Sequence, residues 1–195
     1  MLNHIRPAIV MIVLFTGVLG VAYPFAVTGA AQVAFPEQAG GSLVRDKAGK
    51  VVGSALVGQG FAEPVYLHPR PSAAGDGYDA SASSGSNLGP LNPDLIARVK
   101  TDADALRAAA GTTTVPADAV TTSASGLDPH ISPAYAKLQA ARIAKARGVA
   151  VEEVSKVIEQ HVEGRTFGVL GQPRVNVLLT NMALDARFAR PAAEG

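Results

Sequence analysis

The chain has 195 residues, a net charge of +1 and no cysteine. The lack of cysteine excludes a disulfide-stapled scaffold and cysteine-ligated metal sites, and the near-neutral charge balance gives no sign of a nucleic-acid partner. The length that remains after an N-terminal apolar run suits one domain with a real hydrophobic core.

The first predicted element is an uncharged apolar run at residues 8–27, with the sequence AIVMIVLFTGVLGVAYPFAV. In a helix that rises ~1.5 Å per residue, about 20 residues cross the ~30 Å hydrocarbon core of a bilayer. Lipid offers no partner to backbone N–H and C=O groups, so the form that crosses is a helix. The run therefore predicts a single transmembrane helix.

The charges beside this helix predict its orientation. Arg6 and the free N-terminus precede it, and the next charged residue is Glu37. The positive-inside rule then places residues 1–7 in the cytoplasm and residues 28–190 outside it. A rival interpretation is a cleaved secretory signal, because residues 28–31 are small and resemble a cleavage site. The apolar run is longer than the usual core of such a signal.

Short strands are predicted after the membrane helix. Apolar runs at 43–45 and 51–57 flank a Gly-containing loop at 46–50, a pattern typical of a β-hairpin. Gly53 within the second run indicates a bulge or a close approach of the backbone to another group. A further short strand is predicted at 65–67.

Residues 70–90 are rich in Pro, Ser, Gly and Asn and show no periodicity. Loops of this length in compact domains are either functional or disordered. Tyr78, Asn87 and Leu88 are side chains that can fasten such a loop to the domain, so we predict an ordered surface loop.

Two helices are marked by both of their caps. The first covers 93–110, with Asn92 as N-cap, a proline at the first helical position and Gly111 after its end. The second covers 133–147, begins after Ser132 in the same way, and carries several basic side chains.

The remaining elements complete an α+β fold. We predict a helix at 151–163, a strand at 175–179, a short helix at 181–188 and a disordered tail at 191–195. Strands at both ends with helices between them indicate one extracytoplasmic domain with a small sheet and about three to four helices against one face.

Candidate catalytic residues gather in one turn, SASGLDPHIS, which contains Ser125, Asp128 and His130. A secreted hydrolase would use these residue types, but the members of a catalytic triad usually converge from different elements. The alternative is a structural turn, in which Ser125 and Asp128 bond nearby backbone N–H groups and Gly126 supplies an unusual φ. No G-x-S-x-G motif is present.

Other signals for chemistry are weak. Gly58-Gln59-Gly60 lacks the third glycine of a dinucleotide-binding fingerprint. His68, His130 and His161 are isolated in the sequence, so no metal site is predicted. The residues alone therefore indicate an anchored accessory or binding domain and not an autonomous enzyme.

Motifs along nearly the whole chain resemble those of the C subunit of the bacterial Kdp complex, the high-affinity potassium-transporting P-type ATPase. Two local departures concern packing: Ala34-Phe35 stands where the family often has an aromatic pair, and Leu67 where it often has Phe. The motifs are Arg6-Pro7-Ala8, Tyr23-Pro24, Gly53-Ser54-Ala55-Leu56-Val57-Gly58-Gln59, Arg70-Pro71-Ser72, Gly85-Ser86-Asn87-Leu88, Ser123-Ala124-Ser125-Gly126-Leu127-Asp128, Gln139, Arg142, Gly171-Gln172-Pro173 and Val175-Asn176-Val177.

The resemblance implies a single-pass subunit of the bacterial inner membrane, with its C-terminal domain in the periplasm. Its partners would be a channel-like potassium-translocating subunit, an ATP-hydrolysing P-type ATPase subunit, a small single-span subunit and membrane lipid. It would have no cofactor of its own, because ATP and potassium are handled by the partner subunits.

The family is also described as a catalytic chaperone that raises the nucleotide affinity of the pump subunit, with a Gln matching Gln139 linked to nucleotide contact. A periplasmic domain cannot touch cytosolic ATP, so two alternatives stand: coupling at a distance, or a cytoplasmic nucleotide-binding domain. The candidate partner-contact residues are Arg70, Ser72, Tyr78, Asn87, Ser125, Asp128, Gln139 and Arg142.

Overall fold

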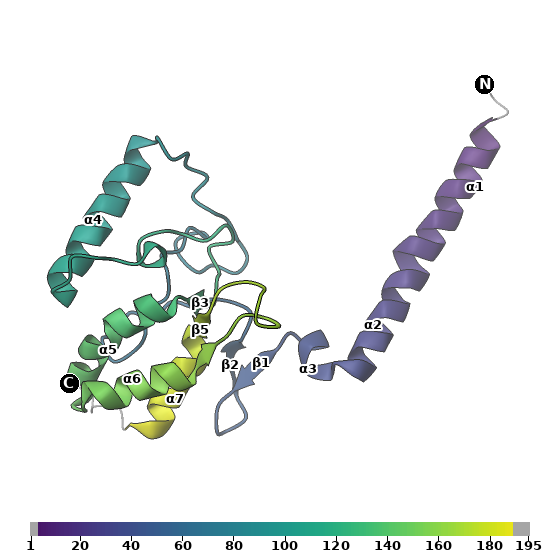
Figure 1. Cartoon of the computed structure of the whole chain (residues 1–195). Helices are drawn as coiled ribbons and strands as arrows, with labels where there is room; N and C mark the ends of the chain where they lie inside the picture. The colour runs from purple at the N-terminus through teal and green to yellow at the C-terminus, as the bar shows by residue number, and fades with distance from the viewer. Residues whose placement is uncertain (1–3, 189–195) are drawn as a thin grey trace. The chain divides into compact units, whose positions relative to one another are not determined.

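The computed structural model describes residues 4–188, and its N-terminal part is one long apolar helix (Figure 1). It consists of α1 (Ile5–Phe15), a π-helical stretch (Thr16–Ala22) and α2 (Tyr23–Ala34). None of its side chains is buried within the protein, and by length and composition it can cross a membrane. We attribute the π turns to Pro24, whose ring would clash with a carbonyl of a regular α-helix.

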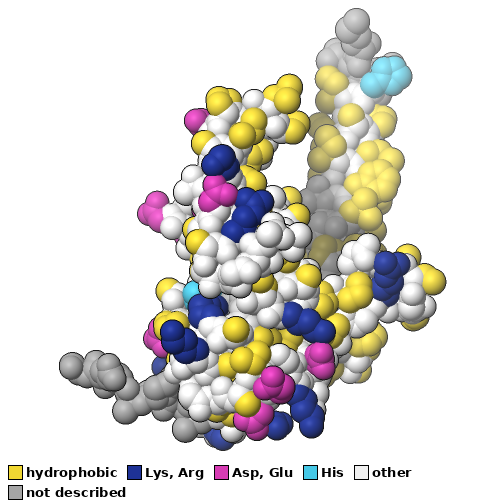
Figure 2. Space-filling model, turned by 60° about the vertical axis from the view of Figure 1, so that its left-hand side comes forward, with side chains coloured by type: hydrophobic (Ala, Val, Ile, Leu, Met, Phe, Trp, Pro, Cys, Tyr) yellow, Lys and Arg dark blue, Asp and Glu magenta, His cyan; other side chains and the backbone are white. Residues whose placement is uncertain are grey.

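The helix is longer than the predicted span of 8–27, because Ile5–Ala34 form 30 helical residues. Figure 2 shows hydrophobic side chains along it, whereas the charged side chains lie over the other elements of the visible face. At ~1.5 Å per residue a helix of this length exceeds the ~30 Å hydrocarbon core of a bilayer.

A β-hairpin follows a short helix, α3 (Pro36–Ala39). Its strands are β1 (Leu43–Arg45) and β2 (Val51–Ser54), which form a two-stranded sheet. Asp46 Oδ1 accepts hydrogen bonds from two N–H groups of the loop, each at 2.9 Å. The predicted hairpin is confirmed, although its second strand ends before residue 57. The chain divides here into two compact units, between Val52 and Gly53.

The second unit has a three-stranded antiparallel sheet in the order β3-β5-β4. The strands are β3 (His130–Ile131), β4 (Val162–Glu163) and β5 (Arg174–Asn176). Helices α5 (Pro133–Arg147), α6 (Val151–Gln160) and α7 (Val177–Arg187) pack together beside it (Figure 1). The largest fully buried apolar side chains, Leu67, Ile143, Val154, Ile158, Val175 and Leu184, come from these elements and from the segment before residue 70.

The predicted caps are confirmed. The Asn92 side chain accepts hydrogen bonds from the first N–H groups of α4 (Pro93–Ala110), and Gly111 ends that helix in the left-handed conformation. Ser132 caps α5 in the same way, and Gly148 ends it. Only Ala103 of α4 is buried, so this helix buries fewer residues than α5, α6 and α7.

Three predictions of local structure were wrong. Residues 65–67 form no strand, because the chain makes a turn and a bend at residues 64–66. The predicted strand at 175–179 ends at Asn176, whose side chain caps α7 by accepting a hydrogen bond from the Leu179 N–H. The helix predicted to reach residue 163 ends at Gln160, because the next residues pair with β5. The tail at 191–195 lies outside the described residues.

Candidate functional site

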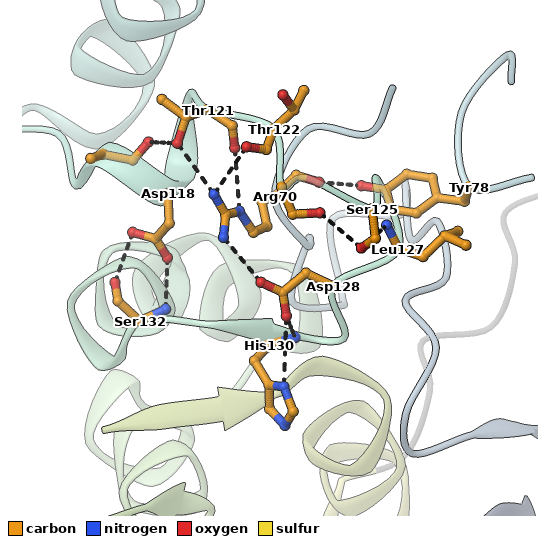
Figure 3. Close-up of polar contacts among 12 residues, drawn as sticks. Arg70, Tyr78, Asp118, Thr121, Thr122, Ser125, Leu127, Asp128, His130 and Ser132 are labelled. Carbon is orange, nitrogen blue, oxygen red and sulfur yellow. Dashed lines mark hydrogen bonds and ion pairs between the residues drawn. The ribbon is translucent and has the colours of Figure 1, made fainter. Parts of the chain in front are cut away.

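The two turn-rich segments 70–88 and 121–130 lie against each other, and Arg70 joins them (Figure 3). We call this region the loop junction. Arg70 Nη1 donates to Asp128 Oδ2 at 3.0 Å, and its Nε and Nη2 donate to two backbone carbonyls of the second segment at 3.3 and 3.2 Å. With a further bond to the Thr121 hydroxyl, one half-buried guanidinium therefore binds four acceptors of the opposite loop.

Ser72 and Tyr78 fasten the loop junction from its first segment. Ser72 Oγ donates to the Gly126 carbonyl at 2.6 Å and accepts a hydrogen bond from the Tyr78 N–H at 2.9 Å. The Tyr78 hydroxyl donates to the Arg70 carbonyl. Burial raises the pKa of Tyr78 to about 12, so its hydroxyl keeps its proton at physiological pH. These bonds confirm that the loop is ordered.

Asp128 is the carboxylate of the loop junction that forms an ion pair with Arg70. Burial alone would raise the pKa of Asp128, but hydrogen bonds from His130 and Arg70 outweigh it and hold the pKa below its usual value. Asp128 Oδ1 accepts a hydrogen bond from the His130 N–H at 3.0 Å and lies 3.6 Å from Nδ1 of the same residue. Asp128 is therefore an ionised, structural anion at neutral pH.

The geometry of a Ser–His–Asp triad is not formed. Ser125 Oγ accepts a hydrogen bond from the Leu127 N–H at 3.1 Å and lies 3.3 Å from Ser123 Oγ. Within residues 4–188 no hydrogen bond joins Ser125 to His130. Gly126 has a φ of 67°, so the interpretation of this stretch as a structural turn is confirmed.

A second cluster surrounds residues 64–68, a stretch outside any helix or strand that we call the clamped segment. Each of its five carbonyls accepts a hydrogen bond from a side chain of α5 or α7. The donors are Arg142, Arg147, Gln139 and Asn181. The segment is therefore paired with side chains where a strand would pair with another strand, which is why the predicted strand at 65–67 is absent.

Two amides bind the clamped segment on both sides of the backbone. Asn181 accepts from the Leu67 N–H at 2.7 Å and donates to the Leu67 carbonyl at 3.0 Å. Gln139 does the same for His68, at 2.8 and 3.0 Å. Gln139 is 5% exposed and Asn181 2%. Both amides thus reproduce the paired bonds of an antiparallel ladder.

Two arginines of α5 complete the cluster. Arg142 Nη2 donates to Gln139 Oε1 at 2.7 Å, and burial lowers the pKa of Arg142. The side chain of Arg147 is fully buried and pairs with Asp185 at 2.8 Å. The pKa of His68 is lowered by burial and by the positive charge of Arg142. A buried cation that also binds several carbonyls is well compensated, and removing its partners would be costly.

An open groove of about 660 Å³ lies between α4 and α5, next to this cluster. Leu106 of α4 and Leu138 of α5 line it together with Gln139, Arg142 and Lys145. Its volume is within the range of small-molecule sites.

The structure thus places seven of the eight candidate partner-contact residues in two groups. Arg70, Ser72, Tyr78, Ser125 and Asp128 belong to the loop junction, and Gln139 and Arg142 to the second cluster. Asn87 lies in the first loop with a φ of 53° and takes part in neither set of contacts described above.

The sequence interpretation missed Asn181 and Arg147. Asn181 has a detectable signal, because it shares the apolar face of α7 with Leu178 and Leu184, three residues away on either side. A lone amide on such a face is expected to find a buried partner.

Comparisons with known proteins give a matching family and similar relatives. The family model described as K+-transporting ATPase, c chain, matches residues 5–186. The chain is 64% identical over 195 residues to the potassium-transporting ATPase KdpC subunit of Caulobacter sp. (strain K31), and covers 100% of both chains. It is 58% identical over 190 residues to the subunit of the same name from Beijerinckia indica, covering 96% of each chain.

These matches show that the chain is a subunit of a potassium-transporting ATPase. It belongs to the KdpC family, the c chain of these ATPases. Its single N-terminal apolar helix is consistent with a membrane-anchored subunit of a transport complex. Membership of the family implies partner subunits.

Proposed function

We propose that the chain is an accessory subunit without chemistry of its own, with residues 28–190 on the periplasmic face. In this role it stabilises the channel-like and ATP-hydrolysing subunits and raises the apparent ATP affinity of the latter from a distance. A tenfold rise in affinity needs only ~1.4 kcal/mol of preferential contact with one pump conformation. Such coupling requires no contact between this chain and the nucleotide.

The proposal is supported by the burial of the Gln139 side chain and by its hydrogen bonds within the protein. Its amide oxygen accepts hydrogen bonds from the His68 N–H and from Arg142, and its amide nitrogen donates to the His68 carbonyl. With 5% of its surface exposed, it offers little to a ligand. An effect of Gln139 on nucleotide affinity is then best explained by its hydrogen bonds to the backbone of the clamped segment.

A second candidate function is direct nucleotide binding from the cytoplasmic side. The groove between α4 and α5 favours it, because it has the volume of a small-molecule site and is lined by Arg142 and Lys145. The two candidates differ in what they require of Lys145, which is exposed at the groove and has no ion pair within the described part of the chain.

We expect Lys145→Ala to leave the apparent KM for ATP of the assembled pump within about twofold of the wild type. A direct phosphate contact would be a charge-assisted bond, whose loss weakens binding roughly tenfold or more. The measurement is ATP hydrolysis by the purified complex as a function of ATP concentration. Lys156→Ala on α6 removes an exposed charge outside the groove and serves as the matched control. A tenfold rise in KM for Lys145→Ala alone would favour direct binding.

A further inference from the structure

The loop between β4 and β5 carries three large apolar side chains in contact with solvent. Phe167 is 90% exposed, Val169 71% and Leu170 60%. Within residues 53–188, no other stretch of four residues presents three large apolar side chains as exposed as these. Single exposed apolar residues need no explanation, but a group of this kind marks an interaction site. We call residues 166–170 the apolar tip.

The apolar tip is held in one conformation. Thr166 and Leu170 exchange two backbone hydrogen bonds, at 2.9 and 3.0 Å. Phe167 lies at a φ of 53°, which is uncommon for a bulky residue, and Gly168 follows at 77°. An ordered loop that displays a phenylalanine loses little conformational entropy when a partner covers it. The tip therefore has the properties of a preformed anchor.

The charged residues next to the apolar tip indicate whether lipid or protein contacts it. Arg174 is paired with Glu163 at 2.8 Å, and Arg165 donates to the Gln172 side chain at 2.9 Å. Of these two arginines, Arg165 is the one without an ion-pair partner within the described residues. Attachment to anionic lipid draws on several unpaired cations, each contributing ~1 kcal/mol. An apolar centre with a mostly neutralised polar rim is instead the pattern of a protein interface.

We propose that the apolar tip inserts Phe167 into an apolar pocket on another subunit of the potassium-transporting ATPase, where Arg165 meets a carboxylate at the pocket rim. This inference rests on the proposed function, which places the chain in a complex with those subunits. Phe167 is the central anchor, and Val169 and Leu170 exclude water around it.

The test is photocrosslinking from the tip in the assembled complex. Phe167→p-benzoylphenylalanine is introduced into the full-length chain, which is produced with its partner subunits and irradiated. We expect a crosslink to one partner subunit, identified by mass spectrometry. Leu91→p-benzoylphenylalanine is the matched control, because Leu91 is 88% exposed but lies outside the tip. We expect at least roughly tenfold less protein crosslinking from this position, since an isolated exposed leucine marks no interface.

Crosslinks from position 167 to lipid alone, or a protein yield equal to that of the control, would overturn the inference. A wild-type chain that does not copurify with the pump would overturn the proposed function itself, and the two failures are therefore distinguishable. A second variant, Phe167→Ser, removes an exposed side chain, so it leaves folding intact. We expect it to speed loss of the chain from the washed complex by roughly tenfold. An unchanged rate would contradict the assignment.

Discussion

Replacing Gly126 by alanine is expected to lower the free energy of unfolding of the second unit by about 3 kcal/mol or more. Gly126 has a φ of 67°, and a Cβ there would lie 2.6 Å from both the Ala74 nitrogen and the Ser84 oxygen. Both are backbone atoms of the opposite loop, which cannot move without opening the loop junction. Urea unfolding of the purified full-length chain, followed by tyrosine fluorescence, measures the loss.

Gly148→Ala is the matched control for this prediction. Gly148 has a nearly identical φ of 65°, but nothing lies within 4 Å of the Cβ that it would gain. Its cost is the left-handed backbone alone, about 1 kcal/mol. The difference between the two variants isolates the contact between the loops, and equal losses would mean that the loops do not touch at Gly126.

Replacing Asn181 by leucine is expected to cost about 3 kcal/mol, although leucine is apolar and similar in size. The substitution leaves the buried N–H and carbonyl of Leu67 without partners, because Asn181 bonds both. An unsatisfied buried polar group costs about 1–3 kcal/mol, and here there are two. The same urea titration measures the effect.

The matched control is Gln160→Leu at the exposed end of α6. It makes the same kind of change without removing a buried hydrogen bond, so we expect a shift within about 0.5 kcal/mol. If Asn181→Leu were as mild as this control, the clamped segment would not depend on its side-chain partners.

Elements whose boundaries are marked by local chemistry were predictable from the sequence. Asn92 and Ser132 as N-caps, and Gly111 and Gly148 as left-handed C-caps, determine the bounds of α4 and α5 without help from the rest of the fold. The hairpin loop around Asp46 is local in the same sense, since the Asp46 side chain bonds the loop's own N–H groups.

Elements that depend on distant partners were not predictable. The clamped segment has the composition of a strand, but its hydrogen-bond partners are side chains that lie 71 and 114 residues away in the sequence. Strand β5 stops at Asn176 because that side chain caps α7, although the apolar run continues. Periodicity cannot separate a short buried strand from the first turn of a buried helix.

The candidate site shows the same division. The turn at Ser125, Gly126 and Asp128 was predictable, because the side chains of Ser125 and Asp128 each accept a hydrogen bond from an N–H group two residues further along. That Arg70 joins this turn to a loop more than 50 residues earlier was not. The resemblance placed Gln139 among the residues linked to function, but only the fold shows that its amide binds the backbone of His68.

We propose that the N-terminal helix stays in the membrane and places the rest of the chain outside the cytoplasm. The chain contains no cysteine, so a single introduced thiol can report its side of the membrane. Leu91→Cys lies at an exposed position of the second unit, and His4→Cys at an exposed position before the apolar helix. Both variants are treated with a membrane-impermeant maleimide in intact spheroplasts. We expect Leu91→Cys to react before lysis and His4→Cys only after it. The reverse pattern, or a mature chain that has lost position 4, would contradict this proposal.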